Sequence, residues 1–168
     1  LDRRYHAQTT ACEDCGPQYR LVDKNGNSLE QQDSIKQTSI LITKNNILAV
    51  QGISGTHLVT GTKSHSPIKE LRKRKKRSER PFAIMVRDED TLLHNFDVTD
   101  KELELIRSWR RPIVLVGKKP IKKHNVLQLI PKKSLDLIAP GLDTVGVMLP
   151  YAPVHFLLFD YLEEPALI

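Results

Sequence analysis

The chain has 168 residues, a length that fits one domain or one domain with a small appendage. Its content of 39% hydrophobic and 27% charged residues is typical of a globular protein, and its net charge is +6. No apolar run approaches the roughly 20 residues that cross a bilayer, and no signal-peptide core opens the chain, so we expect a cytoplasmic protein without membrane contact.

Residues 1–30 are polar and rich in turn residues, so we expect an appendage or linker ahead of a domain over residues 31–168. A chain that opens on Leu1 without Met is expected to be cut from something longer. Cys12 and Cys15 are followed at once by a Gly-Pro turn. A turn after Cys-x-x-Cys is typical of a zinc knuckle and not of a redox helix, so the pair predicts half of a structural Zn²⁺ site. A local disulfide and two idle thiols stay as alternatives.

From residue 31 onward, helix and strand signals alternate. Residues 31–46 fit either period, with Asp33 or Ser34 available as a helix cap. A short strand is expected near residues 47–52, and a helix is expected to start at Ser66-Pro67 and to run into a basic segment.

The second half of the chain continues the alternation. A capping box, Thr99 to Glu102, predicts a helix that ends near Arg110. Strands are expected at residues 81–86, 112–118, 146–150 and 165–168, with a buried helix at 152–162. Alternating helices and strands predict an α/β or α+β fold, a sheet covered by helices.

The segment from Lys69 to Arg80 carries eight Lys or Arg against two Glu, so its local net charge equals that of the whole chain. Composition allows a solvated helix end, a nuclear address, a nucleic-acid patch or a phosphate site. Aromatic residues are only 5% of the chain and none interrupts the run, which weakens a base-stacking interpretation. A Lys and an Arg two residues apart could place an ammonium and a guanidinium on one polyphosphate.

Two of the six histidines stand at element junctions, where open α/β sheets bind ligands. They are His57, after a Gly-containing loop, and His155, at the start of the last helix. Position alone makes both candidate functional residues, although a surface or satisfied histidine is the plain alternative.

Five ordered segments of the chain resemble HypF, a family of hydrogenase-maturation carbamoyltransferases. The first, RRYHAQTTACEDCGP, is similar to the end of that family's zinc finger. The others are similar to its YrdC-like domain: AVQGISGTHL, LRKRKKRSERPFAIM, RRPIVLV and IAPGLDTVGVMLPYAPVHFLLF.

The resemblance implies an α/β fold in which a twisted, mostly parallel, curved sheet with covering helices encloses a positively charged concave site. It also implies a reaction. ATP and carbamate, released from carbamoyl phosphate by a separate domain, form carbamoyl-adenylate and pyrophosphate, with Mg²⁺ expected. A further domain then passes the carbamoyl group to the terminal Cys of a HypE-type partner, on the way to the cyanide ligands of nickel–iron hydrogenase.

The resemblance also assigns roles to residues. Lys75 and Arg77 fall on a Lys-x-Arg motif that contacts ATP phosphates, and Arg80 keeps the charge of the family's Lys before Pro-Phe. The remaining cations of the run are expected to be solvated: Arg72, Lys73, Arg74 and Lys76.

The small substrate is expected to bind near the first histidine. The loop that lines the family's substrate cavity matches Ser54, Gly55, Thr56 and His57. Tyr151 and His155 fall on a Leu-Pro-Tyr-x-Pro-x-His motif, and His155 is expected to line the same cavity or to orient Arg77.

The chain departs from the family pattern in several places, among them Thr56 in place of a Phe and the absence of the finger's first Cys-x-x-Cys. Gln51 replaces a Lys, Gly61 stands where the family has Asp, and the chain ends at Ile168, before a Ser-x-Asn segment of the nucleotide site. These departures keep two other hypotheses open, an RNA- or nucleotide-binding module of YrdC-like fold and an inactive, truncated paralogue.

Overall fold

The computed structural model describes residues 16, 18–29, 33–52, 55–119 and 129–168. Cys12, Cys15 and Ser54 lie outside these residues, so the zinc half-site and part of the substrate loop stay predictions, as does the domain boundary at residue 30. None of the described helices is both long and apolar enough to cross a bilayer.

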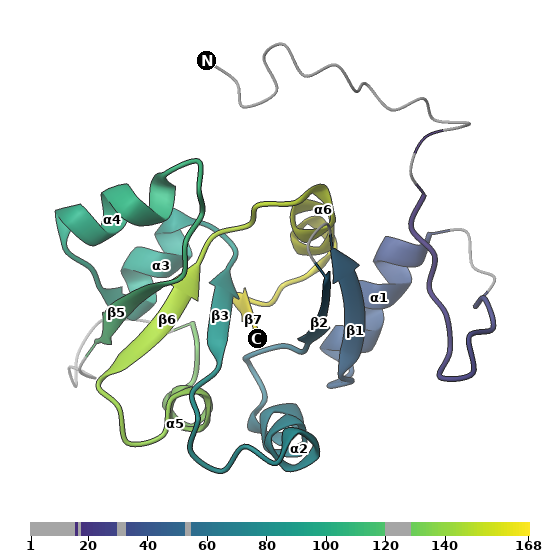
Figure 1. Cartoon of the computed structure of the whole chain (residues 1–168), viewed down its shortest axis with the longest axis horizontal. Coiled ribbons are helices and arrows are strands. Elements are labelled where there is room, and N and C mark those ends of the chain that lie inside the picture. Colours follow the sequence, from purple (N-terminus) through teal and green to yellow (C-terminus); the bar gives the residue numbers. More distant parts are fainter. Residues whose placement is uncertain (1–15, 17, 30–32, 53–54, 120–128) are drawn as a thin grey trace.

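The strands form a two-stranded hairpin and a five-stranded sheet (Figure 1). The hairpin joins β1 (Leu48–Gly52) to β2 (Gly55–Val59) in antiparallel register. The sheet has the order β4-β5-β6-β3-β7. Its strands are β3 (Ala83–Val86), β4 (Phe96–Asp97), β5 (Val114–Lys118), β6 (Thr144–Met148) and β7 (Ala166–Leu167).

The end of the described chain links the hairpin to the sheet. Gly61 forms an isolated antiparallel bridge with Leu167, and the Ile168 amide donates to the Thr60 carbonyl at 3.0 Å. The same stretch is held by Glu164, whose buried carboxylate accepts from the amides of Thr62 and Lys63 at 2.8 and 2.9 Å. These contacts hold the hairpin next to the five-stranded sheet, although the residues that touch are about 100 positions apart in the sequence.

The α/β class is confirmed, but the expected mostly parallel sheet is wrong for the described strands. Only β3 and β6 pair in parallel, whereas the pairs β4–β5, β5–β6 and β3–β7 are antiparallel. The segment between β5 and β6 explains part of this result, because it leaves and re-enters the sheet at the same end. There Gly117 pairs with Thr144, and the Lys118 amide donates to the Asp143 carbonyl at 2.8 Å. The segment is thus a wide hairpin and not a crossover.

Six helices are described: α1 (Ser34–Thr43), α2 (His65–Lys75), α3 (Glu89–Asn95), α4 (Asp100–Arg107), α5 (Lys132–Ile138) and α6 (Pro153–Tyr161). Helices α2 to α5 cover the five-stranded sheet over the larger apolar core, which includes Ile68, Ile84, Leu92 and Val147. Helices α1 and α6 pack beside the hairpin over a second core that includes Ile42 and Leu158 (Figure 1).

Local capping chemistry sets several helix ends. The Asp33 side chain accepts from the amides of Ile35 and Lys36 and caps α1, so Ser34–Thr43 of the ambiguous segment is a helix. The Thr99–Glu102 capping box is confirmed. Helix α2 starts two residues earlier than expected, because Ser64 and not Ser66 is its cap.

Helix α4 ends at Arg107 and not near Arg110. The Ser108 carbonyl accepts from the Arg111 amide at 3.0 Å, and Arg111 has a φ of 46°. Pro112 follows, and a proline disfavours helical backbone in the residue before it. The chain therefore turns sharply here into the strand β5.

Candidate functional site

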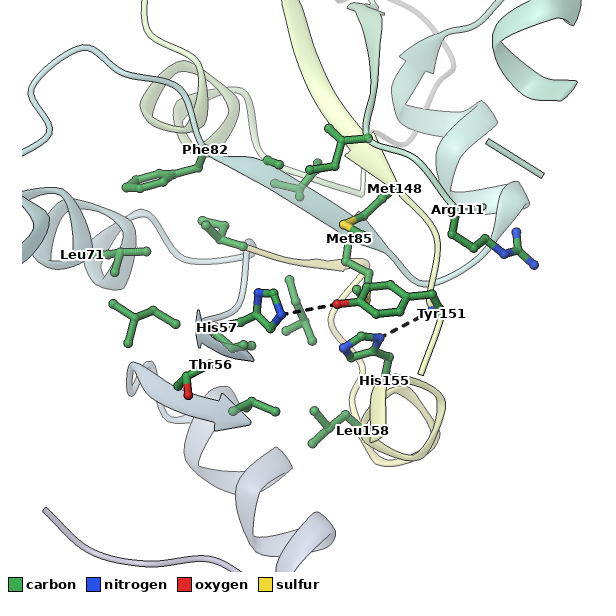
Figure 2. Close-up of a pocket in the computed structure, with 18 of the residues that line it drawn as sticks. Thr56, His57, Leu71, Phe82, Met85, Arg111, Met148, Tyr151, His155 and Leu158 are labelled. Carbon is green, nitrogen blue, oxygen red and sulfur yellow. Dashed lines mark hydrogen bonds between the residues drawn. The ribbon is translucent and has the colours of Figure 1, made fainter. Parts of the chain in front are cut away.

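One cavity of about 630 Å³ opens between the hairpin, the end of α2 and the start of α6. Its volume is in the range of small-molecule sites. Its apolar wall includes Phe82, just before β3, with Met85 on β3, Met148 on β6 and Leu158 on α6 (Figure 2). Polar side chains from several elements also line it, so the space offers an apolar surface with a few polar groups.

Lys75 and Arg77 bring positive charge to this cavity. Lys75 is the last residue of α2, and Lys76 ends the helix in the left-handed conformation, with a φ of 50°. The chain therefore turns between the two cations, and both line the same space. The Arg77 guanidinium lies 5.9 Å from the centre of the Phe82 ring, which gives it a fixed neighbour on the apolar wall.

Arg72 is the main correction to the expected roles in the basic run. It was expected to be solvated, but it is 8% exposed and its guanidinium lies 4.7 Å over the Phe82 ring. It donates to the carbonyls of Arg77, Ser78, Arg80, Leu137 and Ile138. Burial and the neighbouring Arg77 lower the pKa of Arg72. Arg72 thus holds the segment between α2 and β3 against the end of α5.

The other cations of the run have separate positions. Lys73, Arg74 and Lys76 are exposed, as expected, and Arg74 pairs with Glu70 at 2.7 Å. Arg80 is exposed and is not among the described residues that line the cavity. Its backbone carbonyl accepts from Arg72, and the contact of its side chain with phosphate stays a prediction.

Three polar rings lie at the opposite part of the cavity. His57, on β2, places its Nε2 3.3 Å from the Tyr151 hydroxyl (Figure 2). The Tyr151 ring meets the His155 ring edge-on, with centroids 4.5 Å apart and planes at 73°. All three residues line the cavity together with Thr56. The expectation that His57, Thr56, Tyr151 and His155 share one space agrees with this arrangement.

His155 is 7% exposed and is held by backbone amides. Its Nδ1 accepts from the amides of Tyr151 at 3.4 Å and Ala152 at 3.3 Å. Burial, with a smaller contribution from the charge of His57, lowers the pKa of His155 to about 4. These bonds tie His155 to the backbone just before α6. No hydrogen bond joins His155 to Arg77 among the described residues, and the alternative that it orients Arg77 stays a prediction.

One predicted glycine and two arginines that were not predicted complete the description of the site. Gly55 begins β2 with a φ of 142° and is not among the described lining residues. Arg110 and Arg111 do line the cavity. The sequence analysis used them only as a helix end and as part of the segment RRPIVLV and gave them no role in the site. Paired arginines directly before a strand were the signal that could have identified them.

The lining residues do not fit a magnesium ion held by the protein. Mg²⁺ prefers carboxylate ligands and water, but no Asp or Glu is among the described residues around the cavity. The described part of the chain also has no cluster of three or more His, Cys, Asp or Glu that could hold a metal. Four cations and no lining carboxylate instead favour an anionic ligand.

Two family models match the chain. Residues 40–168 match the Sua5/YciO/YrdC model, described as "Telomere recombination", and residues 1–22 match the HypF finger. Among curated proteins, the chain is 38% identical over 162 residues to the carbamoyltransferase HypF of Rhodobacter capsulatus. It is 40% identical over 210 residues to the probable carbamoyltransferase HypF of Methanocaldococcus jannaschii. These matches cover 95% of this chain but only 20% and 26% of the two relatives.

Solved structures give the same picture. HypF of T. kodakarensis matches 98% of this chain with a TM-score of 0.83 and 39% identity. Full-length HypF in a phosphate- and nucleotide-bound form matches 99% with a TM-score of 0.78 and 39% identity. In both cases the chain covers 20% of the solved chain. P. abyssi Sua5 bound to L-threonine, at 20% identity and a TM-score of 0.62, shows the shared fold. The chain therefore belongs to the Sua5/YciO/YrdC family, and a segment that matches the HypF finger precedes its family domain.

Proposed function

We propose that this chain is the carbamoyl-adenylate-forming part of a HypF-type carbamoyltransferase. ATP and carbamate, derived from carbamoyl phosphate, are the substrates, and pyrophosphate is the second product. A HypE-type protein would receive the carbamoyl group through other parts of the longer protein. The observation that carries the proposal is one cavity with Lys75 and Arg77 at one part, three polar rings at another and no lining carboxylate.

The chemistry needs two anions to meet. A carbamate oxygen attacks the α-phosphorus of ATP, an oxygen–phosphorus bond forms, and the bond from the α-phosphorus to the bridging oxygen breaks. Pyrophosphate leaves with the electron pair and with growing negative charge. Cations held in place by the protein stabilise this developing charge better than water does. This is the role proposed for Lys75 and Arg77.

The other groups position the substrates. The apolar wall with Phe82 and Met85 excludes water around the reacting atoms. The polar rings and Thr56 offer hydrogen bonds to the small planar anion. Mg²⁺, where present, would be carried by the phosphates, because the lining residues supply no carboxylate. Binding of a structural Zn²⁺ by Cys12 and Cys15 is also part of the proposal. It rests on the Cys-x-x-Cys-Gly-Pro sequence, because both residues lie outside the described residues.

Exchange of labelled pyrophosphate into ATP in the presence of carbamate tests the proposal. We expect Lys75→Ala and Arg77→Ala to lower this exchange at least about 10- to 100-fold, the loss typical of a charge-assisted hydrogen bond. Lys73→Ala is the matched control, because Lys73 is exposed on the same helix and outside the cavity lining. Unchanged exchange in both variants would contradict the site. No exchange in the wild type would favour an inactive paralogue.

A further inference from the structure

His155 has a fixed protonation pattern that gives it a defined role in the cavity. We propose that His155 is a neutral imidazole that donates one hydrogen bond, from Nε2–H, to an oxygen of the planar anion that reacts with ATP. The inference rests on the proposed function of this cavity. It goes further by naming the atom, its proton and the chemical group that it binds.

The backbone settles which ring nitrogen carries the proton. The amides of Tyr151 and Ala152 both point at Nδ1, at 3.4 and 3.3 Å, and an amide can only donate. Nδ1 must therefore keep its lone pair as an acceptor. A neutral imidazole carries one proton, so that proton is on Nε2.

The surroundings keep the ring neutral. His155 is 7% exposed, and burial disfavours the charged form. The charged or titratable groups that line the same cavity are His57, Tyr151 and the four cations Lys75, Arg77, Arg110 and Arg111. No Asp or Glu carboxylate is among them to stabilise an imidazolium. The low pKa of His155, about 4, agrees with this environment.

Nε2–H is the atom left for a ligand. Among the residues that the structure describes, none forms a hydrogen bond with Nε2, whereas Nδ1 has two partners. In Figure 2 the dashed line to the backbone leaves one side of the ring, and the other nitrogen lies on the opposite side, toward His57. A donor without acceptor capacity binds an oxygen and cannot bind the amino group of carbamate, so it fixes which way the anion lies.

The tautomer is measured on the whole chain without ligand. Nitrogen-15 NMR at neutral pH is expected to show a bare Nδ1 and a protonated Nε2 for His155, assigned by the loss of these signals in His155→Asn. A protonated Nδ1, or an imidazolium at pH 7, would overturn the inference whatever the chain catalyses.

Two variants, each of which places a polar atom near only one of the two ring nitrogens, separate a ligand contact from a structural cap. In His155→Asn, Oδ1 replaces Nδ1 as acceptor for the backbone amides, but the Nε2 donor is gone. In His155→Gln, the side-chain amide can donate from the Nε2 position, but nothing replaces the Nδ1 acceptor. The two variants therefore each remove one half of what His155 does.

The probe is bicarbonate, a planar anion isoelectronic with carbamate, titrated in the presence of a non-hydrolysable ATP analogue. We expect His155→Asn to unfold near the wild-type urea midpoint but to bind bicarbonate about tenfold more weakly. His155→Gln should unfold earlier and bind within about threefold of wild type. Wild-type affinity in His155→Asn would overturn the inference, because His155 would then be only a cap.

The outcomes also separate this inference from the proposed function. If the wild type exchanges pyrophosphate and His155→Asn matches it in bicarbonate affinity, the function stands and the inference fails. If the wild type binds no bicarbonate and shows no exchange, both the function and the contact are overturned. If exchange is present and only His155→Asn loses affinity, both are supported.

Discussion

At the scale of single residues, His155 couples stability to pH. Its pKa in the folded chain is about 4, below the ordinary value of 6.5. The folded state therefore binds fewer protons than the unfolded state between these values. The stabilisation is complete above about pH 6.5 and is lost as the pH falls toward 4.

The size of the effect follows from the shift. A lowering of this extent corresponds to a free energy on the order of 3 kcal/mol. We expect the free energy of unfolding in urea to fall by about that amount between about pH 7 and pH 4. His155→Gln should show a weaker dependence over the same range, since its side chain does not titrate. An equal pH dependence in the two proteins would contradict the low pKa of His155.

Residue-level prediction from sequence was uneven for a physical reason. The five consecutive cations from Arg72 to Lys76 look alike in composition, yet Arg72 is buried and Lys73 is exposed. What separates them is the direction of each side chain on α2 and the backbone carbonyls of Leu137 and Ile138, more than 60 residues away. No local pattern contains that second fact. Of the cations that line the cavity, Lys75 and Arg77 were assigned to the site only through family resemblance, and Arg110 and Arg111 were not predicted.

At the scale of elements, Arg72 is expected to fix the segment that joins α2 to β3. Arg72→Ala would remove the donor to five backbone carbonyls, most of them half-buried, and leaving a buried polar group unsatisfied costs about 1–3 kcal/mol. We expect the free energy of unfolding to fall by on the order of 3 kcal/mol. Because the Arg77 carbonyl is one of the acceptors, at 2.8 Å, the affinity for ATP should fall as well.

Urea unfolding and calorimetric titration of ATP measure the two effects. Lys73→Ala is the control, because an exposed neighbour on the same helix should change stability by less than about 0.5 kcal/mol. If Arg72→Ala were as stable as Lys73→Ala, the hydrogen bonds of Arg72 to the end of α5 and to the segment before β3 would not contribute to stability.

Elements themselves were predicted better than their pairing. Caps are local, so Asp33 and the box from Thr99 to Glu102 identified helix starts from sequence. Whether two neighbouring strands pair in parallel or antiparallel is not set by the local sequence. The wide hairpin between β5 and β6 depends on where a long connection returns, and helix–strand alternation does not specify that.

Gly61 illustrates the same limit. Its missing side chain looked like a lost acidic group, but a Cβ there would lie 2.6 Å from the Glu164 carboxyl carbon. The buried Glu164 carboxylate already fills that space and binds the following amides of Thr62 and Lys63. The glycine is needed for close approach, which only the three-dimensional contact reveals.

At the scale of the whole molecule, the net charge of +6 invites a nucleic-acid interpretation. The exposed cations Lys73 and Lys76 lie outside the cavity lining, whereas Lys75 and Arg77 are part of it. Exposed Trp109 is stacked against the Arg110 guanidinium at 4.8 Å. No aromatic side chain interrupts the basic run itself, so the run lacks the stacking groups of a single-strand binding surface. The charge therefore predicts weak, sequence-independent attraction to RNA.

Labelled single-stranded RNA and ATP should respond to different cations. We expect RNA to bind with a dissociation constant of about 10⁻⁴ to 10⁻⁶ M at physiological salt, with a steep salt dependence. Lys73→Ala and Lys76→Asn should each flatten the slope of log K against log salt by about 0.7 and leave ATP affinity unchanged. Asn suits position 76 because it tolerates the left-handed backbone found there. Lys75→Ala should weaken ATP far more than RNA. Tight RNA binding that ATP displaces and that Lys75→Ala abolishes would instead place RNA in the cavity and make the binding-module hypothesis the better one.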